Sequence, residues 1–200
     1  MRCERSYPED FKDAFKRTPP NGKELDQLRA RSSHPPIFVY GHLMLPTVLK
    51  YFANVPQTTK VDMVYATLPE YKLYHFSNNK EPGPPTIKRT LSSVDVVEGM
   101  LVFGLTTEQR RGVHEAENSC SGQTILTYVE VQVPQIDNIG IHNVRSQKSV
   151  DAGTFVWRSG EDGLWPMPTT FWPMEDFLNG QLYENIVRHQ NKVQGEEDID

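Results

Sequence analysis

In the stretch FVYGHLMLPTVL, from Phe38 to Leu49, a short apolar strand runs directly into a turn that opens a helix. Gly41 lies in this turn, and glycine reaches backbone conformations that other residues avoid. At a helix start, unpaired N–H groups and partial positive charge favour an anion. The turn is therefore either a simple chain reversal or an anion site approached by a ligand. In the second case, Gly41→Ala is expected to impair binding more than stability.

Composition and charge limit the classes of function. The chain has 200 residues and 37% hydrophobic content, which is enough for one core and favours a single domain. Its net charge is −5, with 21 basic and 26 acidic residues, so no broad basic face is expected for nucleic acid or anionic lipid. We therefore expect a small-molecule substrate, with no nucleic-acid or membrane partner, and we leave the oligomeric state open.

Cysteine usage and hydropathy predict the compartment. Cys3 and Cys120 are the only cysteines, which is too few for a disulfide framework, and neither belongs to a CxxC motif. We interpret both as reduced thiols. The charged N-terminus has no apolar segment typical of a signal peptide, and no run approaches the length of a membrane span. These features predict a soluble, cytoplasmic protein.

The chain divides into three parts. Residues 1–35 form a polar, proline-containing N-terminal extension, with helical patterns around Phe11 and Leu25 that need docking to be stable. Residues 36–190 form the folded domain, and residues 191–200 form an acidic tail.

Strand-like segments dominate the domain. We expect strands over residues 37–40, 61–68, 71–76, 94–105, 124–133 and 152–157. Fewer segments have helical patterns, and they cover residues 46–53, 107–117 and 175–189, the last continuing through Gly180 with one apolar face. The proline-rich stretches from Ser77 to Pro85 and from Trp165 to Pro168 are expected to be loops.

Three patterns could carry chemistry. His114 to Glu117 reads His-Glu-Ala-Glu, but it lacks the second histidine that a zinc helix needs four residues on. Cys120 has no adjacent base or cation to activate a nucleophile, so a plain thiol is the better interpretation. Glu117 is a lone carboxylate at a helix end, and by spacing alone it would be an exposed surface residue.

Eight short motifs together change this interpretation. In chain order they are FVYGHLM, ATLPEYKLY, PPTI, VVEGMLVFGLT, EAEN, VEVQV, AGTFVW and WPMEDF. Their order and spacing over residues 37–178 resemble the gamma-glutamylcyclotransferase-like family, including its avirulence-induced-gene branch. This resemblance implies an α+β fold, in which helices flank a small, mixed but mainly antiparallel β-barrel with a cavity at one end.

The same resemblance implies a site and a reaction. Backbone amides around Gly41, His42 and Leu43 would hold the α-carboxylate of a glutamyl group, while Tyr40 and Met44 would shape the wall. Glu117 would be the catalytic acid and base. The substrate's own α-amine would attack the γ-carbonyl and release 5-oxoproline and a free amine, without a metal or organic cofactor.

This sequence departs from the family pattern around the implied pocket. His42 replaces a small hydroxyl residue, so a bulky titratable ring stands where a carboxylate contact is expected. Further departures occur at Pro84, His114, Ala116, Thr124 and Leu126. These differences leave the substrate open.

Three functions are therefore carried forward. The first is a gamma-glutamylcyclotransferase-type enzyme acting on a gamma-glutamyl amine, peptide or conjugate. The second is a Glu117-dependent cyclase, isomerase or lyase of a specialised metabolite. The third is a binding protein on the same fold without turnover. Fold alone does not separate them, because function depends on the site.

Overall fold

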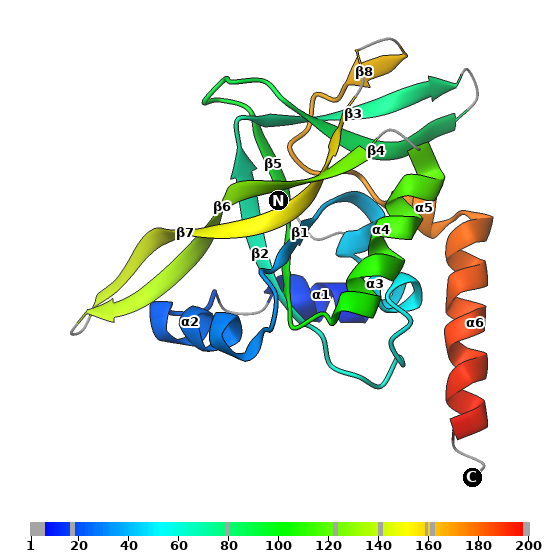
Figure 1. Ribbon diagram of the computed structural model, residues 1–200, viewed down its shortest axis with the longest axis horizontal. Coiled ribbons are helices and arrows are strands. Elements are labelled where there is room, and N and C mark those ends of the chain that lie inside the picture. The colour runs from blue at the N-terminus through cyan, green and yellow to red at the C-terminus, as the bar shows by residue number, and fades with distance from the viewer. Residues whose placement is uncertain are drawn as a thin grey trace.

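The computed structural model describes residues 7–16, 19–78, 81–121, 124–139, 142–158, 160 and 163–197. Five strands form a closed barrel in the order β1-β5-β2-β6-β7, with helices around it (Figure 1). β1 pairs in parallel with β7, and the other pairings are antiparallel. The expected fold class is therefore confirmed. The barrel strands are β1 (Ile37–Val39), β2 (Asp62–Pro69), β5 (Val96–Phe103), β6 (Thr124–Ile139) and β7 (His142–Trp157).

β1 lies at the centre of the hydrophobic core. Ile37, Phe38 and Val39 are all buried, and the strand is hydrogen-bonded between β5 and β7. A strand that is buried on both faces needs a continuous apolar run instead of alternation, and this explains the sequence of β1. The turn that follows β1 is consequently held at a fixed place beside the barrel.

A second, smaller sheet differs from the sequence prediction. Its order is β4-β3-β8, from β3 (Tyr71–Asn78), β4 (Glu81–Arg89) and β8 (Leu164–Pro166). The predicted loops from Ser77 to Pro85 and from Trp165 to Pro168 are therefore wrong in part. Proline is tolerated in β4 because β4 is an edge strand, where one row of N–H groups needs no partner.

The hairpin of β6 and β7 is also longer than predicted. The sequence predicts strands over residues 124–133 and 152–157, yet each strand has 16 residues, and they pair continuously from Thr124↔Trp157 to Ile139↔His142. The far half of the hairpin extends beyond the barrel over α2 (Figure 1). The polar, proline-containing sequence of this half lacks a clear strand pattern, and it is the β6–β7 pairing that identifies it as strand.

The helices before and after the barrel strands agree with their predicted positions. A 3₁₀ turn, η1 (Gly41–Met44), leads into α3 (Pro46–Phe52), and Pro46 occupies the first turn, where its missing N–H is harmless. α4 (Thr107–Ser121) follows β5. Thr106 and Gln109 exchange reciprocal side-chain to backbone hydrogen bonds, a capping box that fixes the start of α4.

The N-terminal helices α1 (Glu9–Lys16) and α2 (Gly22–Arg31) pack onto the domain. Phe11 and Leu25 are fully buried in the main core. Asp10 accepts hydrogen bonds from the backbone N–H and the hydroxyl of Thr47, at 3.0 and 2.7 Å, at the start of α3. Docking of this kind supplies the stability that isolated helices this short lack.

The predicted C-terminal helix is broken. The structure has α5 (Glu175–Leu178) and α6 (Gln181–Glu197), with a turn at Gly180 between them. The glycine has low helix propensity, and the turn resets the helical phase. As a result Leu182, predicted on the apolar face, is 52% exposed while Ile186 is buried. In the described part of the chain, no helix is long and apolar enough to cross a membrane.

Candidate active site

The Gly41 turn is built tightly and is not open. Gly41 has φ of +64°, which favours glycine, and a Cβ at this position would collide with the Pro85 ring from β4. The turn therefore serves to pack β4 against the end of β1. This revises the expectation that a side chain at Gly41 would harm binding more than stability, because the collision affects the folded protein itself.

Tyr40 projects from the end of β1 into the interior. Its hydroxyl donates a 2.7 Å hydrogen bond to the carbonyl oxygen of Phe155 on β7. Burial raises the pKa of the Tyr40 phenol well above its ordinary value, and the nearby charge of Glu117 raises it further. Tyr40 therefore stays protonated and acts as a fixed hydrogen-bond donor.

α4 brings Glu117 to Tyr40 because it packs very closely against α3. Gly112 lies so near the carbonyl oxygen of Phe52 that a Cβ would clash with it. The same side of α4 carries Val113 and Ala116, which are buried. This packing directs the next inward residue, Glu117, toward the barrel.

Glu117 is a buried carboxyl. Its residue is only 8% exposed, in contrast to the exposure usual for glutamate. Burial raises its pKa from the ordinary 4.5 to about 8, because the charged form loses its hydration. The group is consequently a carboxylic acid at neutral pH, yet it can release its proton close to that pH.

A third polar group lies beside this pair. Thr86 of β4 is 2% exposed, and it is close enough to the Tyr40 hydroxyl to lower the pKa of that phenol. Among the described residues its Oγ1 has no partner with good hydrogen-bond geometry, so its interaction with the Tyr40 hydroxyl is a weak one. Buried hydroxyls are usually paired, so this position is a candidate for a specific role.

His42 points into a different environment. Its ring contacts the rings of Phe177, Phe52 and Trp172, with centroids 5.5, 6.0 and 6.4 Å away. Burial lowers its pKa from 6.5 to about 4, so the imidazole is neutral. His42 thus joins α3 to the segment around α5. Leu43 and Met44, its neighbours in the predicted binding turn, are also fully packed in the core.

The structure therefore places two of the predicted site residues, Tyr40 and Glu117, close enough for the charge of one to act on the other, and it adds groups that the sequence did not indicate. Phe155 and Thr86 lie more than 40 positions from Tyr40 in the chain. They belong to the AGTFVW and PPTI motifs that carry the family resemblance, but nothing in those motifs indicates a place beside Tyr40.

The other sequence candidates do not form a metal site. Among the described residues, no three His, Cys, Asp or Glu side chains are arranged to hold an ion. His114 stacks on the Phe155 ring instead, with centroids 5.7 Å apart. The side chain of Cys120 lies outside the described residues.

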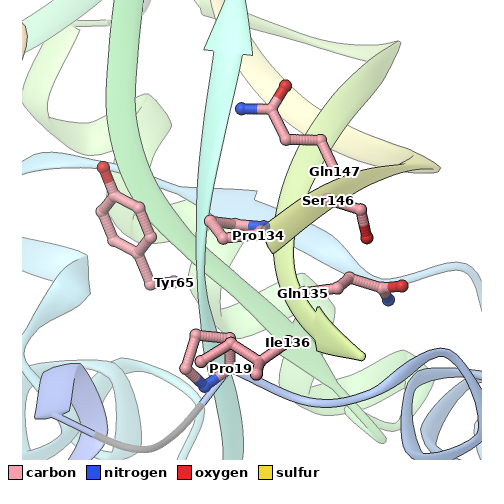
Figure 2. A pocket seen from close by; sticks show the side chains of 7 residues that line it. All are labelled: Pro19, Tyr65, Pro134, Gln135, Ile136, Ser146 and Gln147. Carbon is pink, nitrogen blue, oxygen red and sulfur yellow. The ribbon is translucent and has the colours of Figure 1, made fainter. Parts of the chain in front are cut away.

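A separate groove lies along the far half of the β6–β7 hairpin (Figure 2). It has a volume of about 750 Å³. Its lining residues come from β2, β6, β7 and the segment before α2, and they are Pro19, Tyr65, Pro134, Gln135, Ile136, Ser146 and Gln147. Glu117 and Tyr40 are not among them. The groove is therefore distinct from the candidate active site.

Two solved structures resemble this chain at low sequence identity. A structure titled gamma-glutamyl cyclotransferase has 17% identity and a TM-score of 0.41, covering 66% of this chain and 71% of its own. A crystal structure of a human protein described as uncharacterized has 19% identity and a TM-score of 0.44, covering 67% and 72%. No curated protein matches the chain.

A protein-family model covers most of the domain. Residues 37–174 match the family described as "Gamma-glutamyl cyclotransferase, AIG2-like". The matched span begins at the first residue of β1, contains Tyr40 and Glu117, and ends just before α5. It confirms the resemblance carried by the sequence motifs. The chain belongs to the gamma-glutamyl cyclotransferase, AIG2-like family.

Proposed function

We propose that this protein is a gamma-glutamylcyclotransferase-type enzyme in which Glu117 moves the protons. The observation that carries the proposal is the buried Glu117 carboxyl beside Tyr40, with a pKa of about 8. A general acid and base works best when its pKa is near the working pH. Family membership indicates the class of reaction, and burial gives Glu117 a pKa that suits acid and base catalysis.

In the proposed reaction the substrate's α-amine attacks its own γ-carbonyl carbon. Glu117 accepts a proton from that amine as the new C–N bond forms and closes the five-membered ring. It then gives a proton to the leaving nitrogen as the original C–N bond breaks. The products are 5-oxoproline and a free amine. Because the reacting groups belong to one molecule, holding it in a folded pose supplies much of the acceleration.

The protonation state of Glu117 in the free enzyme is compatible with these reaction steps. With a pKa of about 8, roughly one Glu117 in ten is ionised at pH 7. A substrate ammonium bound next to it would favour the carboxylate, because opposite charges stabilise each other in a buried site. The ammonium then loses one proton to solvent, which leaves a neutral amine beside the Glu117 carboxylate, and the carboxylate accepts a second proton as that amine attacks.

The proposal is tested by incubating the purified protein with gamma-glutamyl amines, peptides and conjugates and measuring 5-oxoproline. Release that depends on Glu117 is expected, and Glu117→Gln is the matched control. If no such compound yields 5-oxoproline, the proposed reaction is wrong. Glu117-dependent conversion of another metabolite would then favour the cyclase, isomerase or lyase alternative, and binding without turnover would favour a binding protein.

A further inference from the structure

His114 and Asn118 form a polar pair on α4 next to Glu117. Asn118 Nδ2 lies 3.1 Å from His114 Nε2, and the Thr124 hydroxyl lies 3.3 Å from Asn118 Oδ1. Residues three or four positions apart are neighbours on a helix surface, so His114 and Glu117 share one side of α4. The pair therefore belongs to the surroundings of the candidate active site.

The hydrogen bonds of Asn118 determine which nitrogen of His114 carries the proton. The Thr124 hydroxyl donates to Asn118 Oδ1, and the Asn118 amide nitrogen lies against His114 Nε2, to which it donates. A neutral imidazole has one N–H and one acceptor nitrogen. Because Nε2 accepts here, the proton is on Nδ1.

The orientation of the His114 ring is fixed as well. It stacks on Phe155 at an interplanar angle of 14°, and the carbonyl of Phe155 binds the Tyr40 hydroxyl. Among the described residues, Nδ1 of His114 has no hydrogen-bond partner. The ring is thus held in place from two sides, by Phe155 and by Asn118.

We propose that His114 Nδ1–H is a catalytic hydrogen-bond donor to the acyl oxygen of the substrate. This inference rests on the proposed function. When the substrate amine attacks the γ-carbonyl, the carbonyl π electrons move to the oxygen and the amine proton goes to Glu117. His114 Nδ1–H donates to the oxyanion without losing its proton. The electrons return to re-form the carbonyl as the leaving C–N bond breaks, and Glu117 protonates the leaving nitrogen.

A neutral donor suits this task because it is placed before charge develops and needs no change of protonation. Donors of this kind act in the transition state more than in the bound ground state, so their loss lowers kcat. The Asn118 and Thr124 side chains act through His114, and they are positioning residues. Mutations of Asn118 or Thr124 should therefore affect turnover only through the His114 ring, whereas mutations of His114 remove the donor itself.

Turnover of two His114 variants provides the first test. His114→Phe keeps an aromatic ring for Phe155 but has no donor, and kcat for 5-oxoproline release should fall about 100- to 1,000-fold with KM within about threefold. His114→Asn places an amide N–H near the Nδ1 position, and it should retain kcat within about tenfold. Unchanged kcat in His114→Phe, or equal losses in both variants, would overturn the proposal.

Nitrogen NMR of the imidazole provides a test that does not depend on turnover. In wild-type protein, His114 should show a protonated Nδ1 and an unprotonated Nε2, and added 5-oxoproline should shift Nδ1 more than Nε2. Asn118→Asp should reverse the preference, since a carboxylate accepts from Nε2–H. A wild-type His114 protonated on Nε2 would refute the donor even in an active enzyme. Absence of 5-oxoproline release with Nδ1 protonated would instead refute the proposed function.

Discussion

Glu117 on α4 and His42 in the η1 turn are two buried titratable groups, and burial shifts their pKa values in opposite directions. The pKa of Glu117 rises to about 8, while that of His42 falls to about 4. Both side chains are therefore neutral at pH 7. Only Glu117 can exchange a proton near that pH, however. The sequence pointed to both residues. In the structure, the environment of Glu117 suits proton transfer, whereas that of His42 indicates a packing role.

Their neighbours explain this difference. Glu117 lies near the Tyr40 hydroxyl, which is fixed by the Phe155 carbonyl, whereas three aromatic rings surround His42. Polar groups beside a buried carboxyl can stabilise either of its protonation states, while an apolar aromatic cluster favours only a neutral ring. His42 is thus a structural link between α3 and the α5 segment in this conformation.

The largest expected effect is on turnover at the Glu117 side. Glu117→Gln should lower 5-oxoproline release by about 100- to 10,000-fold, because an amide of the same shape cannot transfer the proton. The fold should persist, since one neutral buried group replaces another. Rate assays paired with thermal unfolding check both statements. A variant that turns over like wild type would remove Glu117 from the mechanism.

The next effect concerns Gly41, which precedes His42 in the η1 turn. Gly41→Ala should lower the free energy of unfolding by about 2–5 kcal/mol, combining left-handed strain with the collision against Pro85. Gly104→Ala is the matched control, because Gly104 has φ of +76° but open space around it. It should lose only about 1–2 kcal/mol. Equal losses in denaturant titrations would show that the Pro85 contact does not matter.

The pH dependence of the unfolding free energy should also distinguish Glu117 from His42. Glu117 binds its proton more tightly in the folded state, so its contribution to stability is complete below pH 4.5 and is lost as pH rises through about 8. His42 behaves oppositely, because the unfolded state binds its proton more tightly. Its contribution is present above pH 6.5 and is lost as pH falls through about 4.

Two variants should therefore flatten opposite parts of the stability profile. Glu117→Gln should reduce the decline between pH 4.5 and 8, and His42→Phe should reduce the decline between pH 6.5 and 4. Each slope amounts to at most about 1.4 kcal/mol per pH unit. Unfolding free energies measured from pH 4 to 9 provide the check. Identical profiles for the two variants would contradict the contrast between these groups.

Local patterns in the sequence were sufficient to predict much of the barrel and its helices. The apolar run of β1 and the order of the motifs depend on neighbours in the chain. β4 was missed because proline hides an edge strand, and the helix break at Gly180 was missed because the apolar spacing continues across it.

The candidate site was less predictable because its contacts are long-range. The sequence indicated Tyr40 and Glu117, but not that the Tyr40 hydroxyl binds the Phe155 carbonyl 115 positions away. It also gave no direction for the ring of His42, which depends on Phe177 and Trp172 from the far end of the domain. Such placements follow from tertiary packing, and periodicity carries no information about them.

The most direct test of the account is a titration of the Glu117 carboxyl by carbon NMR, with Glu117→Gln used to assign the signal. The account predicts a pKa of about 8, since burial removes hydration from the charged form. Addition of a bound gamma-glutamyl compound should change that value, because its ammonium would lie next to the carboxyl. A carboxyl that titrates near 4.5 and does not respond to the compound would contradict the central claim that Glu117 is the buried acid and base of this protein.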